Sequence, residues 1–403
     1  MDIRAARESE LVQVVELNCV AFNPGQHERY WQYLRGDNSY RLSQTRVVVV
    51  NDRVVSTLRV WERRIRVGAS LVTMAGIGGV CTQPKYQGVG YASALMRQTI
   101  GYLKTRGYDL GVLFTIIPEE FYHRLGWISF PLKGFEIKCN SASRLESQSS
   151  WQIRAFNAKK DLDGVAKIHD IVNAQQSGSI SRTRAYWDME PSRIRGILPT
   201  VVIHQNGNIG GYLNYQIDGK CAEVREVGYY SDNPEVLDGL ISHLLQVCVA
   251  EGIDEIKGIF SPQHAFVQCL IAECKGEITQ TSDSSMMFYA VSLSTLLRRL
   301  VVKWESLIAA ANGALPSLAV KLPTVNDQQV VLRYNGRDTI QVVESDSDAV
   351  NLEMSEEEFW QLLFGEIGWG QVKSDSLVSA EVSAFLDVLF PKRDVIFWYP
   401  DRY

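Results

Sequence analysis

The chain has 403 residues, of which 46% are hydrophobic and 22% charged, so it is too long for a single core and too apolar for intrinsic disorder. At roughly 150 residues per domain, two or three domains are expected. The formal net charge is −5, which argues against a protein-wide surface for nucleic acid or for an anionic membrane. Local basic patches remain possible.

The N-terminal segment and the cysteine and histidine spacings exclude several classes of protein. Asp2 and Glu8 interrupt the stretch where a signal peptide needs an apolar run, and no segment approaches the roughly 18 apolar residues of a membrane span. We therefore expect a cytoplasmic protein without membrane insertion. The 7 cysteines are scattered, no Cys-x-x-Cys occurs, and the 6 histidines never fall at HExxH spacing. Neither a disulfide framework nor a metal site is expected.

Residues 2–117 carry the pattern of a mixed α/β domain. Within 2–45, apolar residues recur near helical spacing, and valine-rich segments 47–50 and 54–60 then flank the turn pair Asn51-Asp52, which predicts a β-hairpin. A glycine-bearing strand at 71–82, an amphipathic helix at 93–103 and a strand at 110–117 follow. The apolar face of the first helix is expected to be made by Val12, Val15, Leu17, Val20 and Phe22.

The same order of elements returns in the middle of the chain. Strand-like segments 201–203 and 212–215 flank Asn206-Gly207, a helix is predicted at 237–250, and a strand follows at 255–260. Gly107-Tyr108-Asp109 and Gly252-Ile253-Asp254 precede corresponding strands at an offset of 145 residues. This self-similarity indicates a duplicated domain.

From about residue 292 the pattern changes to that of an α+β domain. A helix is predicted at 296–311, strands at 330–334 and 339–343, and helices at 355–363 and 380–390. Ser355 and Glu358 form a capping box at the start of the first of the last two helices. We expect a mixed α/β (α+β) protein with domains at 1–140, 150–290 and 292–403, packed together without linkers.

A glycine loop between the strand at 71–82 and the helix at 93–103 is the most informative segment. With glycine at 88 and 90 and the small Ala92, successive backbone N–H groups can converge on a pyrophosphate, assisted by the positive end of the helix dipole. A plain strand-to-helix turn would carry similar glycines, so the alternatives must be tested by motif.

Two common phosphate-binding motifs fail at this loop. A dinucleotide fingerprint requires glycine at 81 or 93, where the chain has Cys81 and Ser93. A P-loop requires Gly-Lys-Ser or Gly-Lys-Thr, and the nearest match, Gly219-Lys220, is followed by Cys221. The pattern Gln/Arg-x-x-Gly-x-Gly/Ala does fit residues 87–92.

Read as Gln87-Gly88-Val89-Gly90-Tyr91-Ala92, this pattern resembles the acyl-CoA loop of the GNAT acetyltransferase superfamily. The resemblance implies that acetyl-CoA is the co-substrate, with its pantetheine arm beside the strand and its pyrophosphate on the loop. The contacts it implies are Val80, Cys81, Thr82, Gln87, Gly88, Val89, Gly90, Tyr91, Ala92, Ser93, Ile117 and Pro118. In a narrower group of this superfamily, Ser-Glu is usual in place of Ile117-Pro118, and arginines are usual in place of Gln87-Gly88. The contact of this chain with CoA is therefore expected to rely more on backbone N–H groups than on side-chain charge.

Phe121-Tyr122-His123-Arg124-Leu125-Gly126-Trp127 resembles the tyrosine-bearing segment of the GNAT family. More narrowly, the whole chain, with its domains in the order given above, resembles the enhanced intracellular survival (Eis) acetyltransferases. That resemblance implies two tandem GNAT-like domains, the second degenerate, a sterol-carrier-like third domain, and a hexamer. At the offset of 145, acidic and bulky residues replace Gln87, Gly88, Gly90 and Ala92: Asp232, Asn233, Glu235 and Leu237. The carboxylates among them would repel a pyrophosphate.

Acetyl transfer to an amine needs an oxyanion donor, an acid for the departing thiolate and a base. A backbone N–H in residues 80–82 can supply the first. The resemblance implies that Tyr122 is the acid and that the α-carboxylate of Tyr403 is the base. Glu119, Glu120 and His123 are rival bases beside Tyr122, and without the resemblance Tyr122 would be read as a packing residue.

An aromatic and acidic cluster, which also includes Tyr30 and Tyr40, is the candidate acceptor site. Glu28, Trp31, Tyr33 and Asp37 are expected to bind the amine, since aromatic faces and carboxylates both attract cations. An amphipathic helix with core aromatics is the simpler alternative. The resemblance implies aminoglycoside- or polyamine-like small molecules or protein lysines as acceptors. The competing hypothesis is an inactive protein that binds an apolar ligand in the third domain.

Overall fold

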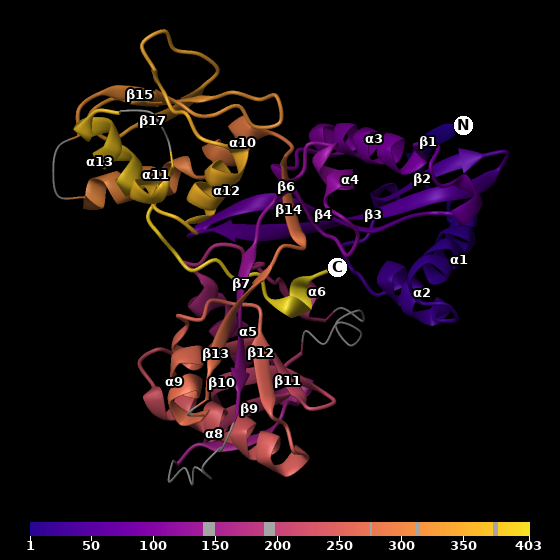
Figure 1. Cartoon of the computed structure of the whole chain (residues 1–403), viewed down its shortest axis with the longest axis vertical. Coiled ribbons are helices and arrows are strands. Elements are labelled where there is room, and N and C mark those ends of the chain that lie inside the picture. The colour runs from indigo at the N-terminus through magenta and orange to yellow at the C-terminus, as the bar shows by residue number, and fades with distance from the viewer. Residues whose placement is uncertain (140–149, 189–197, 275, 312–314, 374–377) are drawn as a thin grey trace. The chain divides into compact units, whose positions relative to one another are not determined.

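The computed structural model describes residues 1–139, 150–188, 198–274, 276–311, 315–373 and 378–403, which belong to two compact units (Figure 1). Unit 1 comprises residues 1–130, 285–394 and 403, and unit 2 comprises residues 131–284 and 395–402. Each unit is therefore assembled from separated stretches of chain. Within the described ranges, no helix is both long and apolar enough to cross a membrane.

Unit 1 is built on a seven-stranded sheet with one parallel pair. Its order is β1 (Asp2–Ala5), β2 (Thr45–Val50), β3 (Arg53–Val67), β4 (Ser70–Thr82), β5 (Leu110–Phe114), β14 (Met286–Ala290) and β6 (Ile128–Ser129). Asn51 and Asp52 have φ values of 48° and 58°, as the tight hairpin turn predicted from the sequence requires. Only β4 and β5 pair in parallel, so a crossover helix, α3 (Tyr91–Arg106), connects them.

Helices cover both faces of this sheet. On one face, α3 packs against Val48 and Val60, whereas α1 (Leu11–Phe22) and α2 (His27–Arg35) cover the face that carries Val47 and Val49. The alternation of the valines follows from the period of two along a strand. The predicted apolar face of α1 is wrong in part: Leu11, Val14, Val15, Leu17 and Cys19 are buried, while Val12, Val20 and Phe22 are exposed.

The strand predicted at 110–117 is shorter than expected, because β5 ends at Phe114. The Thr115 hydroxyl donates to the Ile117 carbonyl at 3.0 Å and accepts the Ile117 N–H at 3.1 Å. This local bonding replaces strand pairing and turns the chain. Ile117 is half exposed in the loop that leads to α4 (Glu120–His123).

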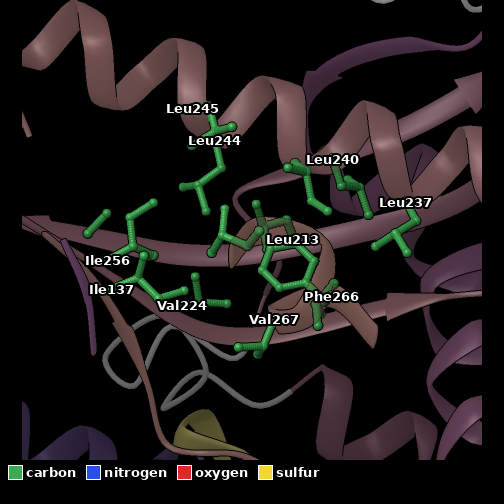
Figure 2. Close-up of a cluster of buried hydrophobic side chains, with 14 of the residues drawn as sticks. Ile137, Leu213, Val224, Leu237, Leu240, Leu244, Leu245, Ile256, Phe266 and Val267 are labelled. Atoms are coloured by element: carbon green, nitrogen blue, oxygen red, sulfur yellow. The ribbon is translucent and has the colours of Figure 1, made fainter. Parts of the chain in front are cut away.

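The sheet of unit 2 repeats the same plan. Its order is β13 (Ile278–Asp283), β7 (Leu132–Lys138), β12 (Glu255–Gly258), β11 (Cys221–Tyr229), β10 (Asn208–Asp218), β9 (Val201–Gln205) and β8 (Gln152–Ala155). The parallel pair is β11 and β12, joined by α8 (Pro234–Glu251). Leu237, Leu240 and Leu244 of α8 point toward the strands (Figure 2) and form the core with α9 (Ala265–Cys274).

Strand exchange distinguishes the two sheets from a simple tandem repeat. The strand beside β5 is β14, from residues 286–290, and the strand beside β12 is β7, from residues 132–138. Each sheet is thus completed by a strand that lies next in sequence to the other unit. The duplication seen in the sequence is real at the level of strand order, but the segments that build each unit are not contiguous.

The two crossover connections differ at their loops. Residues 83–90 separate β4 from α3, whereas only residues 230–233 separate β11 from α8. The offset of 145 therefore holds for β5 and β12 but not across the loop, and the residue-by-residue correspondence predicted there is wrong. Pro234 also occupies the first position of α8, where it has no N–H to offer. The second loop has fewer backbone donors than the first.

Residues 293–394 form an α+β region of unit 1. Its four-stranded sheet has the order β17 (Ile340–Val343), β16 (Val331–Tyr334), β15 (Leu318–Lys321) and β18 (Val350–Asn351). Its helices are α10 (Leu293–Arg298), α11 (Val301–Ala310), α12 (Glu356–Phe364) and α13 (Ala380–Leu389). The helix predicted at 296–311 is two helices, and the capping box at Ser355 and Glu358 is confirmed. The other helices among the described residues are α5 (Ala158–Asn173), α6 (Arg184–Trp187) and short 3-10 turns at Glu8–Glu10, Leu42–Gln44, Pro84–Tyr86, Trp369–Gln371 and Tyr399–Asp401.

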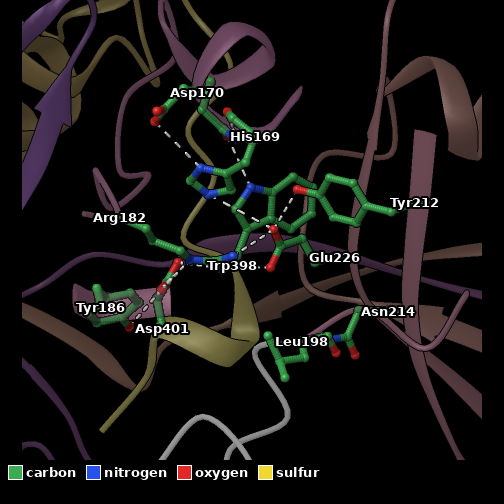
Figure 3. Close-up of polar contacts among 11 residues, drawn as sticks. His169, Asp170, Arg182, Tyr186, Leu198, Tyr212, Asn214, Glu226, Trp398 and Asp401 are labelled. Atoms are coloured by element: carbon green, nitrogen blue, oxygen red, sulfur yellow. Dashed lines mark hydrogen bonds and ion pairs between the residues drawn. The ribbon is translucent and has the colours of Figure 1, made fainter. Parts of the chain in front are cut away.

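The segment 395–402 is anchored in unit 2 by a buried ionic cluster (Figure 3). Arg182, whose side chain has no exposed surface, donates to both carboxylate oxygens of Asp401 at 2.8 and 2.9 Å and to Glu226 at 2.6 and 2.9 Å. Trp398 donates its indole N–H to the Asn173 side chain at 3.0 Å. These bonds hold the aromatic-rich tail in place, as expected of a docked segment rather than a frayed one.

Candidate active site

The glycine loop exposes backbone donors at the start of α3. Gly88 and Gly90 have φ values of 78° and 90°, and a Cβ at either position would meet no atom within 4 Å. Gly90 is the N-cap of α3 and no side chain caps the helix. In the described part of the chain, the N–H groups of residues 88–93 donate no hydrogen bond. The loop therefore offers unpaired donors and the positive end of a helix to an anion.

Strand β4 extends past its parallel partner next to this loop. The pairs with β5 run from Met74 to Ile77, but β4 continues to Thr82. Gly79, with φ 61°, lies where the register between β3 and β4 shifts. No described strand pairs with the β5-facing edge of residues 78–82, so that edge is open to a ligand. The carbonyls of Cys81 and Thr82 already accept from the Ser56 hydroxyl at 3.0 Å and from the Gln87 side chain at 3.1 Å.

Cys81 lies in this free segment, yet its thiol is not a nucleophile. The side chain is buried, and burial raises the pKa of the thiol to about 12. Because the thiolate is the reactive form, the thiol is inert at neutral pH. This argues for direct acyl transfer and against an acyl-cysteine intermediate.

Tyr403 occupies the face of the sheet beside this segment. Its phenol donates to the carbonyl of Val112 on β5 at 2.8 Å. A Cβ on Gly76 would overlap three atoms of the Tyr403 ring, and a Cβ on Gly78 would lie 3.5 Å from the Tyr403 carbonyl carbon. The two glycines of β4 therefore make room for this residue, and its main-chain end lies against β4 at Gly78.

Tyr122 is a buried residue of α4, packed edge-on against Phe121 with ring centroids 4.9 Å apart. It belongs to the core that includes Leu95 and Met96 of α3. Burial raises the pKa of its phenol to about 12, and the hydroxyl has no hydrogen-bond partner among the described residues. The phenol is therefore protonated at neutral pH and free to donate to a ligand.

The rival bases form a surface cluster. Nε2 of His123 lies 3.3 Å from a carboxylate oxygen of Glu119 and 3.1 Å from the Ser129 hydroxyl. The same nitrogen makes both contacts, so the imidazole cannot pass a proton between them as it does in a catalytic triad. Glu120 is exposed on the same short helix.

Comparisons with known proteins agree with this site. Residues 2–129 match the model of the acetyltransferase (GNAT) domain. The protein is an acyltransferase with a GNAT domain. Domains of this family use acetyl-CoA as the acyl donor. No curated protein sequence matches the chain.

Solved structures share the fold over nearly the entire length. A probable N-acyltransferase from Enterococcus faecalis has a TM-score of 0.74 at 16% identity, with 98% of this chain and 97% of that chain covered. A GCN5-related N-acetyltransferase from Anabaena variabilis has a TM-score of 0.69 at 16% identity, with 96% of each covered. Eis1 from Mycobacterium abscessus has a TM-score of 0.67 at 15% identity, with 100% of each covered.

The predicted acceptor residues of the GNAT domain do not all lie together. Tyr33 contacts Trp61 edge-on at 6.0 Å, and Trp61 stacks on Tyr403 at 6.3 Å. Trp31, in contrast, lies under Arg35, and Glu28 is an exposed residue that accepts a hydrogen bond from a neighbour on its own helix. These contacts link Tyr33 with the Tyr403 region, whereas the contact of Trp31 with Arg35 and that of Glu28 with Gln32 lie within α2.

Asp37 reaches the same region but is already paired. One carboxylate oxygen accepts from Arg59 at 2.6 Å and from Arg63 at 3.4 Å, and the other accepts from the Ser39 N–H and hydroxyl at 3.0 and 2.7 Å. Burial raises the pKa of Asp37, but the two guanidinium groups and Ser39 outweigh it, so the net pKa is lowered. This carboxylate is ionised and its oxygens are occupied.

Sequence reasoning missed Arg59, Trp61 and Arg63 of β3. They occupy alternate positions of one strand and hence one face of the sheet. All three are buried despite the two charges. The available signal was Trp61 flanked by an arginine two residues away on each side, which puts two charges and an aromatic ring on one face of the strand.

Proposed function

We propose that this protein is an acetyl-CoA-dependent N-acetyltransferase of the Eis type, acting by direct transfer to an amine. The observation that carries the proposal is the position of Tyr403, which packs against Gly76 and Gly78 of β4. Next to these glycines, residues 78–82 have no partner on β5 and lead into the open glycine loop. This position supports a role for Tyr403 as the general base. The acceptor is a small-molecule amine or a protein lysine.

The residues available fit the acyl donor. The backbone N–H groups of residues 88–93, next to Gln87, would hold the pyrophosphate, residues 80–82 would lie along the pantetheine arm, and Ile117 and Pro118 would border it. Acetyl-CoA supplies the activated thioester. The open space at Gly88 and Gly90 supports this assignment, because larger residues there would obstruct the phosphates.

Acid and base roles are assigned to two tyrosine residues. The phenol of Tyr122, protonated because burial raises its pKa to about 12, donates a proton to the departing thiolate. The α-carboxylate of Tyr403 accepts the amine proton. A free α-carboxyl has an ordinary pKa of roughly 3.3–3.7, so this group is ionised at neutral pH and acts as a base through desolvation or a bridging water.

Calorimetry and kinetics test the proposal together. Titration of the full chain with acetyl-CoA is expected to show one saturable site, and thiol release with amine acceptors is expected to fall in Tyr122→Phe and in a variant extended beyond Tyr403. Unchanged turnover in both variants would disprove the assigned mechanism. Absence of acetyl-CoA binding would disprove the function itself.

Three further parts of the proposal rest on the resemblance to Eis proteins. They are the division into domains at 1–140, 150–290 and 292–403, the sterol-carrier-like nature of the third, and assembly as a hexamer. Light scattering that gives a monomer would remove the last of these.

A further inference from the structure

The face of β3 that meets the Tyr403 region carries two buried arginines. Arg59, Trp61 and Arg63 project from the same face, and Arg59 and Trp61 pair in register with Gly78 and Gly76 of β4. These are the two glycines against which Tyr403 lies. The guanidinium groups therefore belong to the wall of the region assigned above to the acceptor.

Arg59 has hydrogen-bonding capacity that the protein does not use. The residue is only 7% exposed, and its guanidinium carbon lies 3.4 Å from the centroid of the Trp61 ring and 4.8 Å from that of Tyr40. Nη2 donates to Asp37, but Nε and Nη1 have no partner among the described residues. A buried donor without an acceptor costs folding free energy, so an acceptor group that reached Nε and Nη1 of Arg59 would be bound favourably.

Two carboxylates accompany the two guanidinium groups of this wall. Asp37 pairs with Arg59 and Arg63, and the α-carboxylate carbon of Tyr403 would lie 3.5 Å from a Cβ on Gly78, the residue in register with Arg59. Burial lowers the pKa of Arg59 to about 9, Asp37 partly offsets that effect, and the group remains protonated at neutral pH. The inference therefore depends on the two unpaired donors of Arg59 and not on net charge.

We propose that Arg59, positioned by Asp37 and Trp61, binds a carboxylate on the acceptor, so that the substrate is an amine that also carries a carboxylate. The inference rests on the proposed N-acetyltransferase function and narrows its substrate class to amino acids and similar compounds, in place of polycations. A guanidinium group with adjacent free Nε and Nη1 donors is suited to a carboxylate, which accepts charge-assisted hydrogen bonds.

Matched pairs of acceptors test the inference in the unmodified protein. Lysine and cadaverine differ only by the carboxylate, as do tyrosine and tyramine. Thiol release from acetyl-CoA is measured for each, and kcat/KM for the carboxylated member is expected to be higher by about 10- to 100-fold, the effect of hydrogen bonds to a charged group. Equal values, or higher values for cadaverine and tyramine, would overturn it.

A strand-matched variant identifies the residue responsible. Arg59→Met is expected to lower kcat/KM for the carboxylated member more than for the decarboxylated amine, so that the preference disappears, whereas Arg64→Met, at an exposed position of the same strand, retains the preference. Arg59→Lys serves if the Met variant does not fold, because it keeps the charge that pairs with Asp37 and should lose part of the preference. A preference that survives both Arg59 variants would refute the assignment.

The outcomes separate the two proposals. If acetyl-CoA binds and only decarboxylated amines are acetylated, the proposed function is supported and this inference is disproved. Absence of acetyl-CoA binding and of thiol release with every acceptor removes both.

Discussion

Gly76→Ala tests whether the position of Tyr403 governs turnover. The new methyl group would overlap the Tyr403 ring, which must retreat by about 1 Å to reach van der Waals contact. That movement also breaks the 2.8 Å hydrogen bond from the phenol to the Val112 carbonyl. Since a displacement of about 1 Å in a catalytic constellation costs on the order of 100-fold, kcat/KM should fall by about that factor. Overpacking should cost about 1–3 kcal/mol of unfolding free energy.

Thiol release under acetyl-CoA saturation is the assay, with denaturant unfolding of the same preparation to verify the fold. Gly101→Ala is the matched control, because a Cβ at this α3 position meets nothing within 4 Å and Gly→Ala within a helix stabilises by about 1 kcal/mol. The activity loss should be non-additive with removal of Tyr403, since both changes act on one group. A folded Gly76→Ala protein with unaltered kcat/KM would refute the reasoning.

Three other predictions concern the loop, the anchor and the acid. Gly90 and Gly207 have φ values of 90° and 84° with open space around both, so Gly90→Ala and Gly207→Ala should each lower the free energy of unfolding by about 1–2 kcal/mol. Only Gly90→Ala should weaken acetyl-CoA binding, as measured by calorimetry. Arg182→Met leaves buried carboxylates without their cation and should cost about 3–5 kcal/mol in denaturant unfolding, whereas Arg184→Met, on a side chain 61% exposed, should change little. Burial raises the pKa of Tyr122 to about 12, so the alkaline limb of the pH profile of kcat should lie near pH 12. The stability that this residue contributes is full below its unfolded pKa of about 10 and is lost as the pH rises through 12. An alkaline limb near pH 10 would contradict its role as the acid.

Features that depend on a few adjacent residues could be predicted from the sequence. The turn at Asn51-Asp52 requires two residues with positive φ, and asparagine and aspartate tolerate that conformation. The capping box at Ser355 depends on a spacing of three residues, and the pattern predicts the helix after the glycine loop, although α3 starts at Tyr91, next to the N-cap Gly90, and not at residue 93. The physical cause in each case lies within one turn of backbone, so a local pattern suffices.

Features that depend on distant residues could not be predicted in the same way. The exchange of β7 and β14 between sheets leaves no local mark, because a strand carries the same alternation whichever neighbour it pairs with. The pairing of Asp37 with Arg59 and Arg63 joins residues more than 20 positions apart. An acidic residue in an aromatic segment therefore suggested a cation site, while its actual partners convert the region into one with unused positive donors.

The two sheets show that the fold alone does not supply the anion site. β11, α8 and β12 reproduce the order and the parallel pairing of β4, α3 and β5. What differs is the connection: residues 83–90 supply two glycines in the left-handed region ahead of the helix, whereas the shorter 230–233 connection leads into Pro234. Lengthening that connection would not by itself create a cradle, since the first helical position would still lack an N–H. Binding therefore depends on loop length and on the freedom of particular glycines, which can be lost while the sheet that supports them is retained.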